Sequence, residues 1–232
     1  MNHAVRATRI HLVGAPVLLG TMWSVLAVTF LINVTIWWAL GPEVQNGSAN
    51  TLAISSIYIV AMVAGYQAVT QTFPFAAGMS LTRKAFAGGT ALYALGLAVF
   101  NAVLLFLALL VERATGGWGV SIDFFGIGLA DRLNPLGRLF AYMAPFLATI
   151  AVGVLLGTVY KRWRNTGMVI LSLGTAVIAA ALVLLVQWLD GWSAVGRFLG
   201  NTPLWAWTGG YPLLTAVLCS TGAWLILRRS VP

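Results

Sequence analysis

Charged residues are the scarcest class in this sequence. Only 8% of its 232 residues are Asp, Glu, Lys or Arg, while 60% are hydrophobic. Soluble domains usually carry about 25% charged residues. A soluble core limited by this chain length could not bury so many apolar side chains, whereas a bilayer supplies apolar surroundings for them. The deficit excludes a soluble globular domain and predicts an all-α integral membrane protein.

Residues with reactive or metal-binding side chains are equally few. Cys219 is the single cysteine, which excludes a disulfide within the chain, and the two histidines, His3 and His11, fall in the N-terminal tail, predicted to lie outside the bilayer. No paired carboxylates, nucleophile triad or Gly-Lys-[Ser/Thr] phosphate loop occurs in the apolar stretches. The sequence therefore predicts a chain that is not an enzyme and holds no cofactor or metal.

Long apolar stretches are what the sequence does contain. A helix needs about 20 apolar residues to cross the hydrocarbon layer. The first stretch exceeds the 7–15 residues of a signal-peptide core, so we expect it to stay as a span. We predict one transmembrane domain over 1–232. Six stretches that lack charged residues and histidine are its predicted spans: 17–40, 53–76, 86–111, 139–160, 168–189 and 210–227.

The basic residues are sorted between the connections in a way that predicts orientation. The two tails and the second and fourth connections hold nine basic residues and no acidic one: Arg6, Arg9, Arg83, Lys84, Lys161, Arg162, Arg164, Arg228 and Arg229. The other three connections hold all five acids and four arginines: Glu43, Glu112, Asp123, Asp131, Asp190, Arg113, Arg132, Arg138 and Arg197. Cytoplasmic loops retain Lys and Arg, which predicts that both termini are cytoplasmic.

The absence of Asp, Glu, Lys, Arg and His within the predicted spans limits how this chain could drive transport across a membrane. Proton-driven carriers usually hold Asp, Glu or His inside their spans, and here each ionisable residue lies at or beyond a span end. Active transport would therefore draw on an outside source, most simply a cytoplasmic ATPase. A passive channel, a sodium-coupled carrier or a non-transporting scaffold stays open, since none of them needs a titratable group. A membrane enzyme is the third functional hypothesis, after an ATPase-driven transporter and after a passive channel or scaffold.

The connection at 73–89 is the most informative segment. Its sequence is Phe-Pro-Phe-Ala-Ala-Gly-Met-Ser-Leu-Thr-Arg-Lys-Ala-Phe-Ala-Gly-Gly. Pro74 and the following glycine are predicted to break the second helix, and Ser80 or Thr82 to cap the third. Arg83 and Lys84 then lie at the membrane surface. On physical grounds alone, a basic turn that only sets the topology is a competing interpretation.

This segment resembles the permease subunits of bacterial type-2 ABC exporters, whose small members carry a Phe-Pro, small-residue turn, Arg-Arg/Lys and Phe pattern in the same connection. The resemblance implies a half-size permease in the cytoplasmic membrane, forming a homodimer or heterodimer with two separately encoded ATPases that bind ATP and Mg. It implies export of a hydrophobic or amphipathic compound such as a drug, antibiotic or lipid. The implied ATPase-coupling residues are Phe73, Pro74, Gly78, Thr82, Arg83, Lys84 and Phe86.

The resemblance also bears on the outer side of the chain. The connection with Trp192, Pro203, Trp205 and Trp207 is similar to the re-entrant outer helices that precede the family's last span. Thr202-Pro203 can start a short outer helix, and Asn134-Pro135 has the composition of an N-cap followed by a first-turn proline. We therefore expect short interfacial or re-entrant helices in the outer loops.

Several polar residues lie within the spans. Hydrogen bonding between helices is their default role, and lining a substrate path is the alternative. In the family the first, second and fifth spans flank the path, which favours Asn33, Trp37, Gln67 and Gln71 as pathway candidates over Asn101. Gln67 and Gln71 share a face at α-helical spacing. Gly153 and Gly157 form a close-packing motif that can pack within one chain or between subunits.

Overall fold

The computed structural model describes residues 3–40, 49–50, 52–78, 82–126 and 133–228, and is almost entirely helical. Among the charged residues and caps discussed above, Glu43, Ser80, Asp131, Arg132 and Arg229 lie outside these ranges. The α-helices are α1 (His3–Leu40), α2 (Ser55–Gln67), α3 (Phe73–Gly78), α4 (Arg83–Ala114), α5 (Pro135–Trp188), α6 (Trp192–Asn201) and α7 (Tyr211–Leu227).

Four helical segments have the length and composition of membrane-spanning helices: His11–Leu40, Arg83–Ala114, Pro135–Trp188 and Ala206–Leu227. By these criteria the chain is a multi-pass membrane protein. A further helical run over 52–78 combines a short 3-10 turn, α2, a π turn (Ala68–Thr72) and α3 without interruption. Helices thus occupy every stretch that the sequence predicts to be a span.

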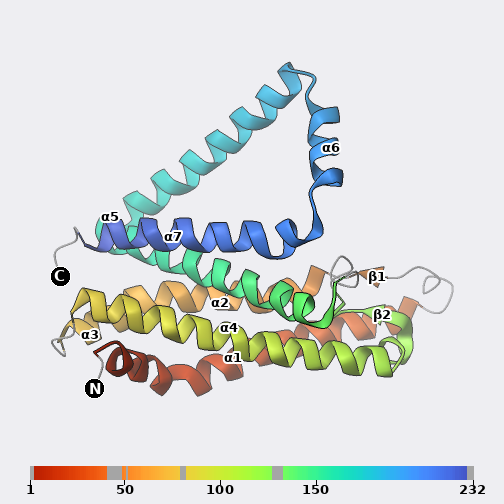
Figure 1. Ribbon diagram of the computed structural model, residues 1–232, viewed down its shortest axis with the longest axis horizontal. Helices are drawn as coiled ribbons and strands as arrows, with labels where there is room; N and C mark the ends of the chain where they lie inside the picture. The colour runs from red at the N-terminus through yellow and green to blue at the C-terminus, as the bar shows by residue number, and fades with distance from the viewer. Residues whose placement is uncertain (1–2, 41–48, 51, 79–81, 127–132, 229–232) are drawn as a thin grey trace.

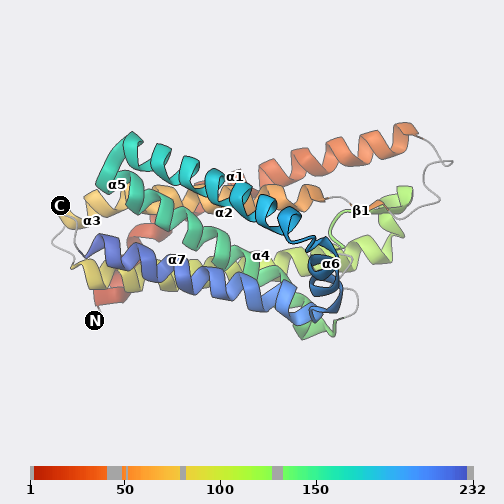
Figure 2. The ribbon, with the colours of Figure 1, turned by 90° about the horizontal axis from the view of Figure 1, so that it is seen from above.

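Helix α5 consists of two arms that meet at a single residue. Arg164 has φ 55° and ψ −145°, which is not helical backbone, and the chain reverses direction there (Figures 1 and 2). The sequence places this reversal in a connection over 161–167, between the fourth and fifth predicted spans. The structure instead keeps helical geometry on both sides of the bend.

The core lies where α1, α2, α4 and the first arm of α5 pack together. Its centre is formed by large side chains with almost no exposed surface: Met22, Leu26, Ile57, Leu105, Tyr142 and Phe146. Helix α7 packs along the outside of the first arm of α5. The second arm of α5 leaves this bundle, and its side chains are exposed on every side over most of its length (Figure 1).

The end of the bundle opposite the N- and C-terminal ends of the chain contains a strand pair that the sequence does not predict (Figure 1). Strand β1 (Ala49–Asn50) pairs in parallel with β2 (Ile122–Asp123). This pairing connects the segment after α1 with the segment after α4. Helix α6 follows the second arm of α5 and leads into α7, so the expected short helix in the last outer connection is present. Its re-entrant character stays a prediction.

The N-cap predictions at Asn134 and Thr82 are confirmed, whereas Thr202 is the C-cap of α6 and its hydroxyl donates to the Phe198 carbonyl of the same helix. The Asn134 side chain accepts a hydrogen bond from the Gly137 amide at 2.7 Å, with Pro135 in the first turn of α5. Thr82 caps α4 by accepting from the Ala85 amide at 3.2 Å. Each N-cap satisfies one of the amides that a helix start leaves without an intrahelical partner.

Candidate functional site: the basic end of the bundle

The segment with the exporter-like motif begins inside a helix. Pro74 was predicted to break or kink the second helix, but the helix continues through it to Gly78. A π turn over Ala68–Thr72 precedes it, in which the Phe73 amide donates to the Ala68 carbonyl five residues back. A proline clashes with the carbonyl four residues before it and cannot donate to it. The wider π turn accommodates the ring without ending the helix.

The same arrangement recurs at the start of α7. A π turn over Ala206–Gly210 precedes Tyr211 and Pro212, and the Tyr211 amide donates to the Ala206 carbonyl. An aromatic residue followed by proline therefore comes directly after both π turns. The two turns lie toward opposite ends of the bundle.

A small cluster joins the motif to the last helix. Phe73 and Phe86 are buried and meet edge to face, with ring centroids 5.0 Å apart. Ala76 and Leu227 complete this cluster. Because Leu227 ends α7, the motif and the C-terminal end of the last helix share one contact surface.

Basic groups surround this aromatic cluster. The Lys161 ammonium lies 3.8 Å from the centroid of the Phe73 ring, a cation–π contact. The Arg83 guanidinium donates to the Arg228 carbonyl at 3.1 Å. Lys84 is exposed beside it. The sequence grouped Arg83 and Lys84 with the motif but missed Lys161, whose proximity depends on the bend of α5.

The predicted coupling residues therefore lie together at one end of the molecule. Phe73 and Phe86 are buried and Arg83 is half-buried, whereas four of the set are exposed: Pro74, Gly78, Thr82 and Lys84. This is also the end where the described chain starts and finishes (Figure 1). Six basic residues whose side chains the structure describes lie at this end, with no acidic one among them: Arg83, Lys84, Lys161, Arg162, Arg164 and Arg228.

The sequence predicts that His11 lies in an N-terminal tail outside the bilayer, whereas in the structure this tail is continuous with the first long helix, whose candidate span begins at His11. His11 lies in α1, is 7% exposed, and its Nε2 is 3.0 Å from the Thr90 hydroxyl of α4. Its ring stacks on Tyr93 at 5.1 Å and is tilted against Phe86 at 5.5 Å. Helix α1 begins at His3, so an apolar stretch alone does not mark where the helix starts.

The pathway candidates are not brought to one place. Asn33 and Trp37 are half-buried on α1, and the Asn33 amide donates to the Thr29 carbonyl of its own helix at 2.8 Å. Gln67 and Gln71 are exposed near the basic end, and a π turn begins between them, so their α-helical spacing does not apply. Asn33 lies 22 residues along α1 from His11, roughly 33 Å at 1.5 Å per residue.

Asn101, the polar residue set aside as a pathway candidate, links two helices. It is fully buried, donates to the Leu97 carbonyl at 2.8 Å and accepts from the Trp23 indole at 3.0 Å. This is the interhelical hydrogen bonding expected by default for polar groups in spans.

The end of the bundle with the strand pair holds a buried carboxylate that the sequence does not single out. Glu112 is 2% exposed at the end of α4, and its oxygens accept from the Trp118 indole at 3.0 Å and the Phe124 amide at 2.9 Å. The amides of Phe125 and Gly126 donate to it at 3.0 and 2.9 Å. We call these four donors the Glu112 cage.

Within the described ranges, no group of three His, Cys, Asp or Glu side chains is placed to hold a metal ion. Comparisons of the chain with protein-family models, with curated proteins and with solved structures found no match. The functional argument therefore depends on the geometry of the chain itself.

Proposed function

We propose that the chain is the permease subunit of a bacterial ATP-driven ABC exporter, which moves a hydrophobic or amphipathic compound across the cytoplasmic membrane by alternating access. It functions in a dimer of permease subunits coupled to two separately encoded ATPases that bind ATP and Mg.

The proposed six-span topology is supported by dividing the helices at their irregular points. Helix α5 divides at Arg164 into arms over 135–163 and 165–188, and the run over 52–78 is about 40 Å long at 1.5 Å per residue. With α1, α4 and the segment Ala206–Leu227, these are the six spans of the proposal; four helical segments meet the length and composition criteria when α5 is kept whole. Because basic loops are retained in the cytoplasm, the basic end and both termini face inward.

The observation that carries the proposal is the convergence at the basic end. The exporter-like motif, the bend of α5 and the end of α7 are far apart in sequence, yet Phe73 contacts Lys161 and Arg83 contacts Arg228. A protein docked on the exposed residues of this end could move several helices together. A basic turn that serves only to set topology would not need such contacts.

The test uses the full-length chain reconstituted with the ATPase encoded nearest its gene. We expect the double variant Arg83→Ala, Lys84→Ala to lose stable assembly, or to lower ATP turnover about tenfold or more, because unpaired charges at an interface are costly. Arg197→Ala, a charge removal on the exposed helix α6, is the matched control and should leave both unchanged.

Assembly and ATP turnover that are unchanged in the double variant would contradict the proposal. Solute flux through the purified chain in liposomes without ATP would favour the passive channel instead. Catalysis by the purified chain would favour a membrane enzyme.

A further inference from the structure

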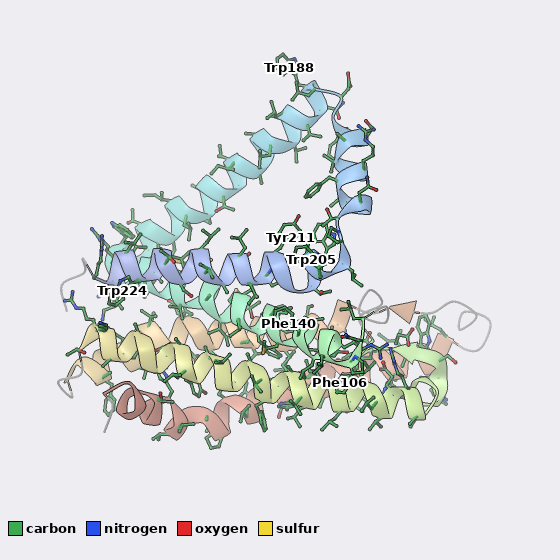
Figure 3. All side chains as sticks on the ribbon, viewed as in Figure 1. Phe106, Phe140, Trp188, Trp205, Tyr211 and Trp224 are labelled. Carbon is green, nitrogen blue, oxygen red and sulfur yellow. The ribbon has the colours of Figure 1, made fainter. Side chains whose placement is uncertain are left out.

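A crevice of about 460 Å³ lies between α4 and α7, apart from the pathway candidates. Its floor is the first arm of α5, and Val69 of the π turn after α2 contributes one edge. Helix α4 supplies one wall: Phe86, Ala87, Thr90, Ala91 and Ala94. Helix α7 supplies the other wall, which includes Ala216, Ser220, Thr221, Trp224 and Leu227. Trp224, labelled in Figure 3, marks its end nearer the basic residues.

The packing of the helices explains why this space exists. Helix α7 packs on α5, and α4 packs on α1 and α5. Helices α4 and α7 approach each other at the basic end, where Phe86 and Leu227 lie in one buried cluster. Farther along, the facing positions carry small side chains such as Ala91, Ala94 and Ala216, which do not fill the gap.

One polar group that lines the crevice, the Thr90 hydroxyl, has a buried side chain, His11, as its hydrogen-bond partner. The Thr90 hydroxyl lines the space and is 3.0 Å from His11 Nε2. His11 is held by stacking on Tyr93, so it orients this hydroxyl. A hydroxyl has one donor proton and two acceptor lone pairs, which leaves Thr90 able to bond a ligand as well. The Thr158 hydroxyl, by contrast, already donates to the Leu155 carbonyl at 2.7 Å.

We infer that this crevice binds an uncharged, mainly apolar molecule that carries a hydroxyl or carbonyl group, which hydrogen-bonds to Thr90. The volume falls within the range of small-molecule sites, about 300–1,000 Å³. None of the described residues that line it is charged, so a charged ligand would lose its hydration without compensation. Binding here needs neither ATP nor an ATPase, so the inference does not depend on the proposed export function.

The test is photolabelling of the full-length chain in lipid nanodiscs with azioctanol, an uncharged alcohol that carries a diazirine. We expect saturable adducts on peptides from 86–94 and 213–227, displaced by excess 1-octanol. Octane lacks the hydroxyl and should compete about three- to tenfold less well, the equivalent of one hydrogen bond. Labelling that never saturates, or that spreads evenly over the exposed second arm of α5, would overturn the inference.

Two variants test the site itself. Thr90→Val removes the hydroxyl at nearly constant size and should weaken labelling about three- to tenfold. Ala216→Leu fills the crevice and should abolish saturable labelling. The controls are Thr215→Val, whose hydroxyl bonds its own helix, and Ala180→Leu, on the exposed arm of α5; neither should change labelling. Wild-type labelling of Ala216→Leu would overturn the inference, and Ala91→Leu replaces that variant if it does not fold.

Discussion

At the scale of single residues, the Glu112 cage shows how a charge is retained beside the apolar core. A buried carboxylate loses its hydration and needs hydrogen bonds in place of it. Glu112 obtains them from one indole and three successive backbone amides over 124–126. Bonds from N–H donors to an ionised carboxylate are among the stronger hydrogen bonds in proteins. They hold the loop after α4 against the end of the helix that precedes it.

The loop reaches Glu112 through backbone conformations with positive φ. Gly116, Gly117, Trp118, Gly119 and Ser121 all have φ between 54° and 76°. Gly117 is doubly constrained, since a Cβ there would approach the Ile122 amide nitrogen at 2.8 Å. The glycines therefore allow the chain to turn back after α4, and hydrogen bonds to Glu112 fix the positions of the amides of Phe124, Phe125 and Gly126.

Glu112→Gln should loosen this loop, because an amide side chain presents only one acceptor oxygen and opposes the remaining donors with its own N–H groups. We expect a loss of about 1–3 kcal/mol in unfolding free energy and faster hydrogen exchange at the amides of Phe124, Phe125 and Gly126. Asp123→Asn changes an adjacent carboxylate outside the cage and is the control. Equal exchange protection in Glu112→Gln and wild type would show that the cage does not hold the loop.

At the scale of elements, the closest approach is between α2 and the first arm of α5. A Cβ at Gly65 would collide with the Ile150 carbonyl, and one at Gly153 with the Met62 carbonyl. One at Gly157 would lie 2.8 Å from the Tyr66 carbonyl oxygen. The motif Gly153–Gly157, for which the sequence leaves two uses open, packs within the chain, as small residues do when helix backbones pack closely in membranes.

Gly153→Ala should force these two helices apart. We expect a cost of about 1–3 kcal/mol, typical of inserting a methyl group into a well-packed site, seen as a lower midpoint of thermal unfolding in detergent. Gly174→Ala is the matched control, since nothing lies within 4 Å of a Cβ there, and its better helix propensity should leave stability equal or slightly higher. Equal midpoints for the two variants would contradict the packing.

The elements also show what a sequence can and cannot predict. Hydropathy and N-caps are local signals, so the apolar stretches that form helices and the caps at Thr82 and Asn134 are predicted correctly. The start of α1 at His3 and the continuation of the helix through Pro74 are not predicted. The roles of three residues depend on contacts that a local sequence pattern does not contain. His11 and Lys161 contact residues that are distant in sequence, and Glu112 is reached by a loop with positive φ angles. Apolar periodicity carries no information on which distant segments meet. The strand pair β1–β2 is unpredicted for the same reason.

At the scale of the whole molecule, the two ends of the bundle differ in the charge of their residues and in their local structure. The basic end carries Arg83, Lys161 and Arg228 around a small aromatic cluster. The other end carries the Glu112 cage and a strand pair, and two of the acidic residues that the structure describes, Glu112 and Asp123, lie there. This division agrees with the charge sorting along the sequence, which predicts cytoplasmic termini.

Orientation can be measured with single cysteines, because Cys219 is the only native one. In a Cys219→Ala background, Asn201→Cys on α6 should react with a membrane-impermeant maleimide in intact cells. Lys84→Cys at the basic end should react only after permeabilisation. Both positions are exposed on the protein surface, so a difference in labelling reports the side of the membrane on which each one lies. Labelling of Lys84→Cys in intact cells would reverse the proposed topology.

The π turn before Phe73 has a mechanical consequence. An α-helix rotates by about 100° per residue, and a π turn holds one residue more than an α turn. Moving the π turn along the helix would turn the residues that it passes about the helix axis by about this angle, while the run over 52–78 stays helical. A push on α3 at the basic end could therefore be passed into α2 as a rotation, with no hinge loop between them.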